Sequence, residues 1–179
     1  MTERRALLAA GLVAALAAAA GVGMGVWRSH AARDAAATEI LFALTLPDAG
    51  GTPQALSQWK GQPLVVNFWA PWCAPCVEEM PDLQGIRDEY HPRGFEVIGL
   101  GIDSAVRIRQ FRDEHRITVP LLVAGPEGTT VADQLGNKSG ALPYTVLIGS
   151  DGRILERKLG RIQPDELRRW FSAHATPKS

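Results

Sequence analysis

The two cysteines are the feature that most constrains the fold and chemistry of this chain. Cys73 and Cys76 are the only cysteines in 179 residues, and they closely follow the mostly apolar run 63–69. We expect a buried strand that ends before the pair and a helix that begins at it. The unpaired N–H groups of a helix start favour thiolate over thiol, and thiolate attacks disulfides. The pair therefore predicts a site that cycles between dithiol and disulfide.

The first 27 residues resemble a targeting segment and not part of a globular fold. Arg4 and Arg5 precede a stretch without charge, from Ala6 to Trp27, that is long enough to cross ~30 Å of hydrocarbon as a helix. We expect an uncleaved signal anchor over residues 1–27. A cleaved signal peptide is the alternative, because Ala-x-Ala patterns are frequent around residues 15–20.

The basic residues that flank this segment are balanced, so charge alone does not set its orientation. The short N-terminal tail favours an N-terminus inside the cell, with the remainder outside the cytoplasm, where disulfide chemistry has substrates. We expect a linker or frayed helix over residues 28–37 and one domain over residues 38–179. The chain has 19 basic and 19 acidic residues and shows no basic stripe, which argues against nucleic acid as a partner.

The order of apolar runs and helical segments predicts an α/β fold with a mixed sheet flanked by helices. We expect strands over residues 40–46, 63–69, 95–102, 119–123, 144–148 and 153–157. We expect helices over residues 73–90, 104–116 and 130–135, and from Pro164 onward. Asp151-Gly152 between two strand-like runs predicts a hairpin, and the run around the cysteines predicts a central β-α-β crossover.

The segment around the cysteines resembles the active site of thioredoxin-fold proteins. Within them, the chain is most similar to the membrane-anchored TlpA/ResA-like thiol–disulfide oxidoreductases. The resemblance covers about residues 38–175 and rests on Lys60-Gly61, Asn67-Phe68-Trp69, Trp69 to Cys76, Glu79 with Pro81, and Gly140 to Thr145. It implies a thioredoxin-like fold, no cofactor, and dithiol–disulfide exchange at Cys73 and Cys76.

An acidic residue on the active-site helix is the second predicted element of the site. Thioredoxins have a buried Asp on the strand before the cysteines, where this chain has Asn67. Glu79 matches the acid that TlpA/ResA-like members have on the helix. Residues three apart share a helical face, so Glu79 can approach Cys76. Spacing alone fits a solvated Glu79 equally well; the resemblance favours proton transfer.

The resemblance and the positions of the cysteines imply separate roles for the site residues. Cys73, nearer the helix start, is expected to attack the substrate disulfide, and Cys76 to resolve the mixed disulfide. The peptide bond before Pro143 is expected to be cis, with the backbone of Leu142 contacting the substrate chain. For Trp72 two interpretations stay open, contact with partner proteins or packing as a partly buried aromatic.

The partners follow from the resemblance. It points to disulfide-bearing exported proteins, such as apocytochrome c or copper-centre assembly proteins, and to a separate membrane thiol electron donor. The domain would face the periplasm or extracytoplasmic space from a bacterial inner membrane.

Alternative functions are a thioredoxin-fold thiol peroxidase and a metal or copper chaperone. A peroxidase needs Thr or Ser three residues before the reactive cysteine, where Ala70 stands. A structural zinc site would need a second pair of ligands, and the sequence has no second cysteine pair. The histidines are scattered along the chain: His30, His91, His115 and His174. A fixed structural bond is a third possibility, but such a short loop stabilises little. We therefore expect no metal site.

The residues between the cysteines predict a reducing pair. The residues between the cysteines are Ala74 and Pro75, and neither is a histidine. The Cys73 thiolate therefore lacks the cationic neighbour that strongly oxidising relatives have at this place. We expect a reduction potential nearer about −270 mV than about −120 mV, the two ends of the thioredoxin-fold range. Equilibration against thiol–disulfide buffers of known potential measures it, and a value near the oxidising end would contradict the prediction.

Overall fold

The computed structural model describes residues 2–174 of the chain, without the side chains of residues 2–20 and 26–27. The chain divides into two compact units, residues 1–34 and residues 35–179. Helix α1, Thr2–Ala43, forms the first unit and ends in the second. Among the described residues, no helix combines the length and apolar character needed to cross a membrane. The expected signal anchor falls largely on residues 2–20, whose side chains lie outside the described part.

A five-stranded mixed sheet forms the centre of the second unit, as predicted. Its strand order is β5-β4-β3-β6-β7, with β4 parallel to both β3 and β5, and with β6 antiparallel to β3 and β7. The strands are β3 Leu64–Trp69, β4 Glu96–Gly101, β5 Leu121–Val123, β6 Tyr144–Ile148 and β7 Ile154–Leu159. Strand β3 is buried along its whole length, because both sheet faces are covered.

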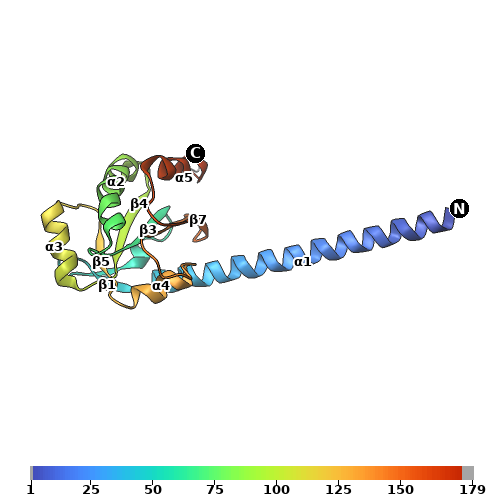
Figure 1. The fold of residues 1–179 in the computed structure, drawn as a ribbon, viewed down its shortest axis with the longest axis horizontal. Helices are drawn as coiled ribbons and strands as arrows, with labels where there is room; N and C mark the ends of the chain where they lie inside the picture. Colours follow the sequence, from blue (N-terminus) through green and yellow to red (C-terminus); the bar gives the residue numbers. More distant parts are fainter. Residues whose placement is uncertain (1, 175–179) are drawn as a thin grey trace. The chain divides into compact units, whose positions relative to one another are not determined.

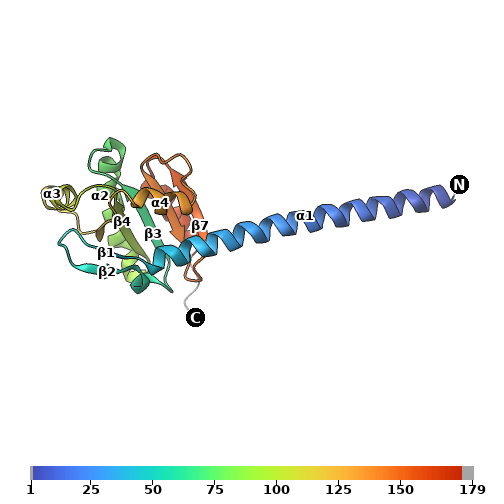
Figure 2. The same ribbon diagram turned by 90° about the horizontal axis from the view of Figure 1, so that it is seen from below.

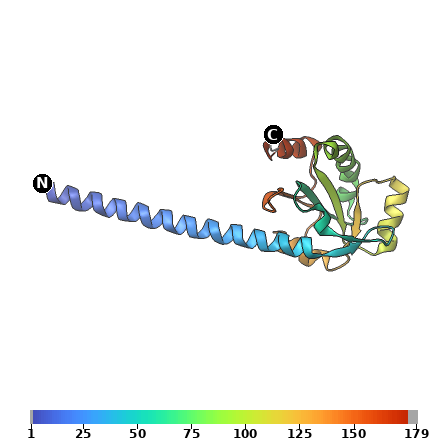
Figure 3. The same ribbon diagram turned by 180° about the vertical axis from the view of Figure 1, so that it is seen from behind.

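Helices cover the two faces of the sheet with separate hydrophobic clusters (Figure 1). Helices α2 Ala74–Tyr90, α3 Ala105–His115 and α5 Pro164–His174 pack on one face. The end of α1, the 3₁₀ helix Leu56–Trp59 and α4 Gly128–Gln134 pack on the other. Side chains alternate along β3, so Val65 and Trp69 face α2 while Val66 and Phe68 face the opposite side. Helices α2 and α5 lie side by side (Figure 3).

The prediction of a first strand over residues 40–46 was wrong for its first half. Residues 40–43 are the last turn of α1, and only Thr45–Pro47 form a strand, β1. The buried residues of this segment lie four apart, as on one face of a helix: Ala37 with Leu41, and Thr38 with Phe42. Strand β1 pairs with β2, Pro53–Ala55, in a separate hairpin that sequence reasoning missed (Figure 2).

Most of the other predicted elements occur within a few residues of their expected bounds. Ser104 caps α3 through a hydrogen bond that its hydroxyl accepts from the Arg107 N–H at 3.4 Å. Asp151-Gly152 joins β6 and β7 in the predicted hairpin. Residues 28–37, expected to form a linker or frayed helix, belong to α1.

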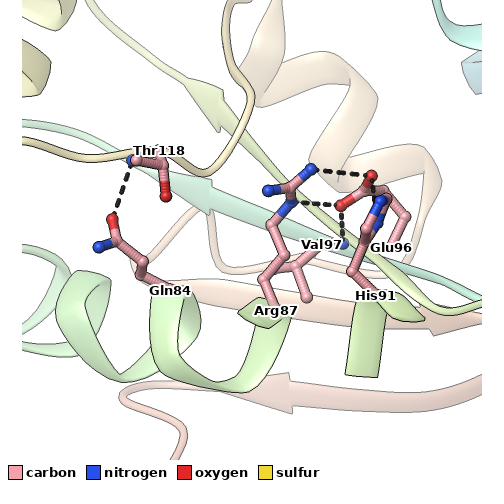
Figure 4. Close-up of polar contacts among 6 residues, drawn as sticks. All are labelled: Gln84, Arg87, His91, Glu96, Val97 and Thr118. Carbon is pink, nitrogen blue, oxygen red and sulfur yellow. Dashed lines mark hydrogen bonds and ion pairs between the residues drawn. The ribbon is translucent and has the colours of Figure 1, made fainter. Parts of the chain in front are cut away.

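A buried carboxylate fixes the second half of α2 on the sheet (Figure 4). Arg87 of α2 donates two hydrogen bonds to Glu96 at the start of β4, and His91 approaches the same carboxylate at 3.2 Å. The Glu96 side chain is only 6 % exposed. One turn earlier, Gln84 accepts a hydrogen bond of 2.8 Å from the Thr118 N–H. These hydrogen bonds and ion pairs add to the apolar packing and fix the position of the helix that carries the cysteines.

Removing the Glu96 carboxylate should destabilise the protein. Glu96→Ala should lower the free energy of unfolding by about 2 kcal/mol, because it leaves the largely buried Arg87 guanidinium without its partner. Urea denaturation of the oxidised full chain measures the difference. Asp133→Ala, which removes an exposed ion pair with Lys138, is the control and should cost under about 0.5 kcal/mol. Equal losses in both variants would contradict this assignment.

Candidate active site

The cysteine pair occupies the junction between β3 and α2. Cys73 is the N-cap residue of α2 and has an extended backbone, with φ −92° and ψ 102°. Its carbonyl accepts hydrogen bonds from the N–H groups of Cys76 and Val77, at 3.0 and 3.1 Å. The two sulfurs form a disulfide, with 5.2 Å between the Cα atoms. The predicted helix start is therefore confirmed, and both sulfurs lie in its first turn.

The two cysteines differ in exposure. Cys73 is 7 % exposed and Cys76 is fully buried, so Cys73 is the more accessible of the two cysteines. Ala74 and Pro75 between them are exposed, and Pro75 lies in the first turn of the helix, where its missing N–H costs no internal bond. Trp72 is 63 % exposed, which favours contact with partner proteins over packing in the core.

Glu79 is a buried carboxylate one turn after Cys76. It is fully buried, although its neighbour Glu78 is exposed. The Asn67 amide donates to Glu79 Oε1 at 2.7 Å, and the Ile162 N–H donates to Oε2 at 2.9 Å. The same amide nitrogen donates to Thr145 Oγ1 on β6 at 3.1 Å. Asn67 and Thr145 are direct cross-strand partners, so the sheet register places both amide and hydroxyl beneath α2.

Burial raises the pKa of Glu79 to about 7. Loss of hydration is the largest influence and disfavours the charged form, whereas the donors on Ile162 and Asn67 favour it. The positive charge of Arg161 lowers this pKa and the negative charge of Asp82 raises it. A carboxyl with a pKa near neutrality can both accept and return a proton, which is what general acid–base chemistry requires.

Residues 142–143 lie at the same end of the sheet as the cysteine turn. Phe68 pairs with Tyr144 across β3 and β6, so the residue before Tyr144 lies beside the end of β3. The Leu142–Pro143 peptide bond is cis, as the resemblance predicted. The Pro143 carbonyl accepts a hydrogen bond of 2.8 Å from the Gly160 N–H, and Leu142 is half-buried. Three segments distant in sequence therefore meet at one end of the sheet.

Two parts of this site were missed by sequence reasoning. Asn67 was noted only as the replacement for an acid, yet its amide is a donor to Glu79. Arg161 and Ile162 were not singled out, because the segment between β7 and α5 has no periodicity or motif that would mark it. Only the fold brings this segment to Glu79.

Two features of the structure concern the residues named for the alternative chemistries. Ala70, at the position where a peroxidase needs a hydroxyl, is fully buried and apolar. Within the described part of the chain, no group of three or more His, Cys, Asp or Glu side chains is placed to hold a metal ion.

This chain is similar in sequence to known proteins. The AhpC/TSA family profile matches residues 37–157. Thiol-disulfide oxidoreductase ResA of Bacillus cereus is 32 % identical over 122 residues, which cover 67 % of this chain and 68 % of that protein.

Solved structures share the thioredoxin-like fold. A thioredoxin-family thiol:disulfide interchange protein from Chlorobium tepidum aligns with a TM-score of 0.66 at 22 % identity, covering 73 % of this chain and 92 % of that one. StoA from Bacillus subtilis aligns with a TM-score of 0.59 at 19 % identity, covering 71 % and 94 %. The predicted fold class of the second unit is thereby confirmed.

The raised pKa of Glu79 should make stability depend on pH. Between its usual value of 4.5 and about 7, the folded state keeps a proton that the unfolded state has lost, so this group removes stability as pH rises. Relative to wild type, Glu79→Gln should gain on the order of 3 kcal/mol in the free energy of unfolding across that window.

Urea denaturation of the oxidised protein at several pH values measures this gain. Asp88→Asn, on the exposed side of the same helix, is the matched control and should follow the wild-type curve. Parallel curves for wild type and Glu79→Gln would show that the buried carboxyl has an ordinary pKa.

Proposed function

The chain belongs to the AhpC/TSA family and is a thiol–disulfide oxidoreductase, and from that premise we propose that it reduces disulfide bonds of exported proteins outside the cytoplasm. The observation that carries this proposal is the combination of a slightly exposed Cys73, a fully buried Cys76 and a fully buried Glu79 at one helix start. Such an arrangement separates the attacking thiol from the resolving thiol and gives the latter a base.

The first step is capture of the substrate. In the reduced protein, the Cys73 thiolate attacks one sulfur of the substrate disulfide. The substrate S–S bond breaks, a mixed disulfide with Cys73 forms, and the other substrate sulfur leaves as a thiolate that takes a proton from solvent. The N-terminal end of α2 stabilises the Cys73 thiolate before the attack.

The second step releases the substrate. Glu79 accepts the Cys76 proton, and the Cys76 thiolate attacks the Cys73 sulfur. The mixed disulfide breaks, and the substrate sulfur leaves as a thiolate that takes a proton from solvent. The substrate then carries two thiols, and the Cys73–Cys76 disulfide has formed. Two electrons pass from the protein to the substrate, so a separate thiol donor must reduce the protein again.

The exposed surface around Cys73 binds the partner protein in this proposal. Trp72 contacts the substrate with its exposed ring, and the backbone of Leu142 beside Pro143 pairs with the substrate chain. The exposed Ala74 and Pro75 hold the helix start without adding charge, which supports a reducing pair. Apocytochrome c and copper-centre assembly proteins are the substrate classes that the resemblance supports.

We further propose that residues 1–27 anchor the protein in a bacterial inner membrane. The support is the uncharged sequence from Ala6 to Trp27, preceded by Arg4 and Arg5. Anchoring would place the second unit on the outer side, close to a membrane thiol donor and to exported substrates during their maturation.

Trapping of mixed disulfides tests the proposed order of attack. Cys76→Ser should capture substrate proteins as adducts that are stable on non-reducing gels, because the resolving thiol is missing. Cys73→Ser should capture none and lose turnover altogether, because Cys76 is buried. Adducts that form with Cys73→Ser, or their absence with Cys76→Ser in the native membrane, would contradict the assignment. Mass spectrometry of the adducts identifies the substrates.

A further inference from the structure

One residue of the segment between β7 and α5 contacts two carboxylates on α2. The Arg161 guanidinium forms ion pairs with Glu78 at 2.9 Å and with Asp82 at 3.2 Å. Glu78 and Asp82 are four residues apart on one face of α2. The next residue in the segment, Ile162, donates its N–H to Glu79. Two consecutive residues thus bind the three carboxylates that α2 carries in little more than one turn.

The electrostatic setting of Glu79 depends on this contact. Like charges nearby disfavour ionisation, and Asp82 acts on Glu79 in this way. Arg161 supplies the opposing charge. The strands beneath α2 present neutral groups, the amide of Asn67 and the hydroxyl of Thr145. Without Arg161, Glu79 would lie beside unneutralised carboxylates while it accepts a proton.

We propose that Arg161 is a positioning residue for thiol–disulfide exchange. By pairing with Glu78 and Asp82 it neutralises the carboxylates beside Glu79 and sets the pH range in which Cys76 can be deprotonated. This inference rests on the proposed function of Glu79 as the base for Cys76.

The Arg161 ion pairs are expected to contribute little to the free energy of folding. The Arg161 side chain is 36 % exposed, and exposed pairs contribute little to folding, about 0–1 kcal/mol. The segment is already held by apolar packing, since Ile162, Leu167 and Phe171 are buried in the same core as α2. Variants at Arg161 are therefore expected to fold, and the effect of the charge should fall on the buried carboxyl beside it.

A single-turnover reaction separates the two steps of exchange. Reduced protein reacts with 5,5′-dithiobis(2-nitrobenzoic acid), whose activated disulfide is attacked quickly by Cys73 and releases one coloured thiolate. Attack by Cys76 on the Cys73 mixed disulfide then releases the second. The rate of this second phase, measured against pH, reports deprotonation of Cys76.

In Arg161→Gln the second phase should need a higher pH. Its rate at pH 7 should fall roughly fivefold, because loss of a nearby opposite charge raises the pKa of a carboxylic acid. The first phase should keep its pH dependence, and the difference between variant and wild type should vanish at high pH. Arg161→Lys keeps the positive charge and should restore most of the rate.

Arg168→Gln is the matched control. Arg168 also pairs with α2, but its partners are Glu89 and Asp165, and within the described part of the chain it forms no ion pair with Glu79. It should leave both phases unchanged. A second phase in Arg161→Gln with the wild-type pH dependence would overturn the inference.

Glu79→Gln distinguishes failure of this inference from failure of the proposed function. If Glu79→Gln shifts the pH dependence of the second phase to higher pH while Arg161→Gln leaves it unchanged, only the role of Arg161 is refuted. If Glu79→Gln also leaves it unchanged, Glu79 is not the base, and both proposals fail. Far-ultraviolet circular dichroism of each variant checks that the fold is intact.

Discussion

The burial of the Glu79 carboxylate against the sheet is the constraint on which the site depends. A carboxylate without water is costly unless donors replace its hydration. Here the donors come from two distant segments, Asn67 on β3 and the Ile162 N–H before α5. These donors offset only part of the cost, so the pKa stays raised to about 7. The site therefore holds a buried carboxyl group whose pKa lies near neutrality because its donors replace only part of the lost hydration.

The sheet topology explains why these segments meet. Strand β3 is central, and both the turn after it and the turn before β6 lie at one end of the sheet. The cysteines follow the first of these turns, and Pro143 lies in the second, immediately before β6. The Gly160 N–H then binds the Pro143 carbonyl, which brings the segment after β7 to the same place. Arg161 and Ile162 reach α2 as a consequence of this connection.

Local signals in the sequence predicted the cysteine pair and the helix start, whereas the resemblance singled out Glu79. The cysteines, the helix start and Glu79 lie within seven residues, and their spacing alone places them on one helix. The end of α1 shows the limit of prediction from local pattern. The apolar run 40–46 fits a strand equally well, and only the burial of residues four apart in the structure shows that its first half is helical. Arg161 and Ile162 could not be predicted, since only the pairing of β6 with β7 brings them to Glu79.

Asn67 occupies the strand position where thioredoxins have an acid, and the buried acid of this chain, Glu79, lies on the helix. An amide stays neutral at every pH, so it adds no second charge to the buried site. Its Oδ1 is buried and has no hydrogen-bond partner among the described residues, while its Nδ2 donates to Glu79. Rotation of the amide would exchange these two atoms. With its Nδ2 toward Glu79, as in this structure, Asn67 donates to the carboxylate; the rotated amide would present an acceptor to a protonated Glu79.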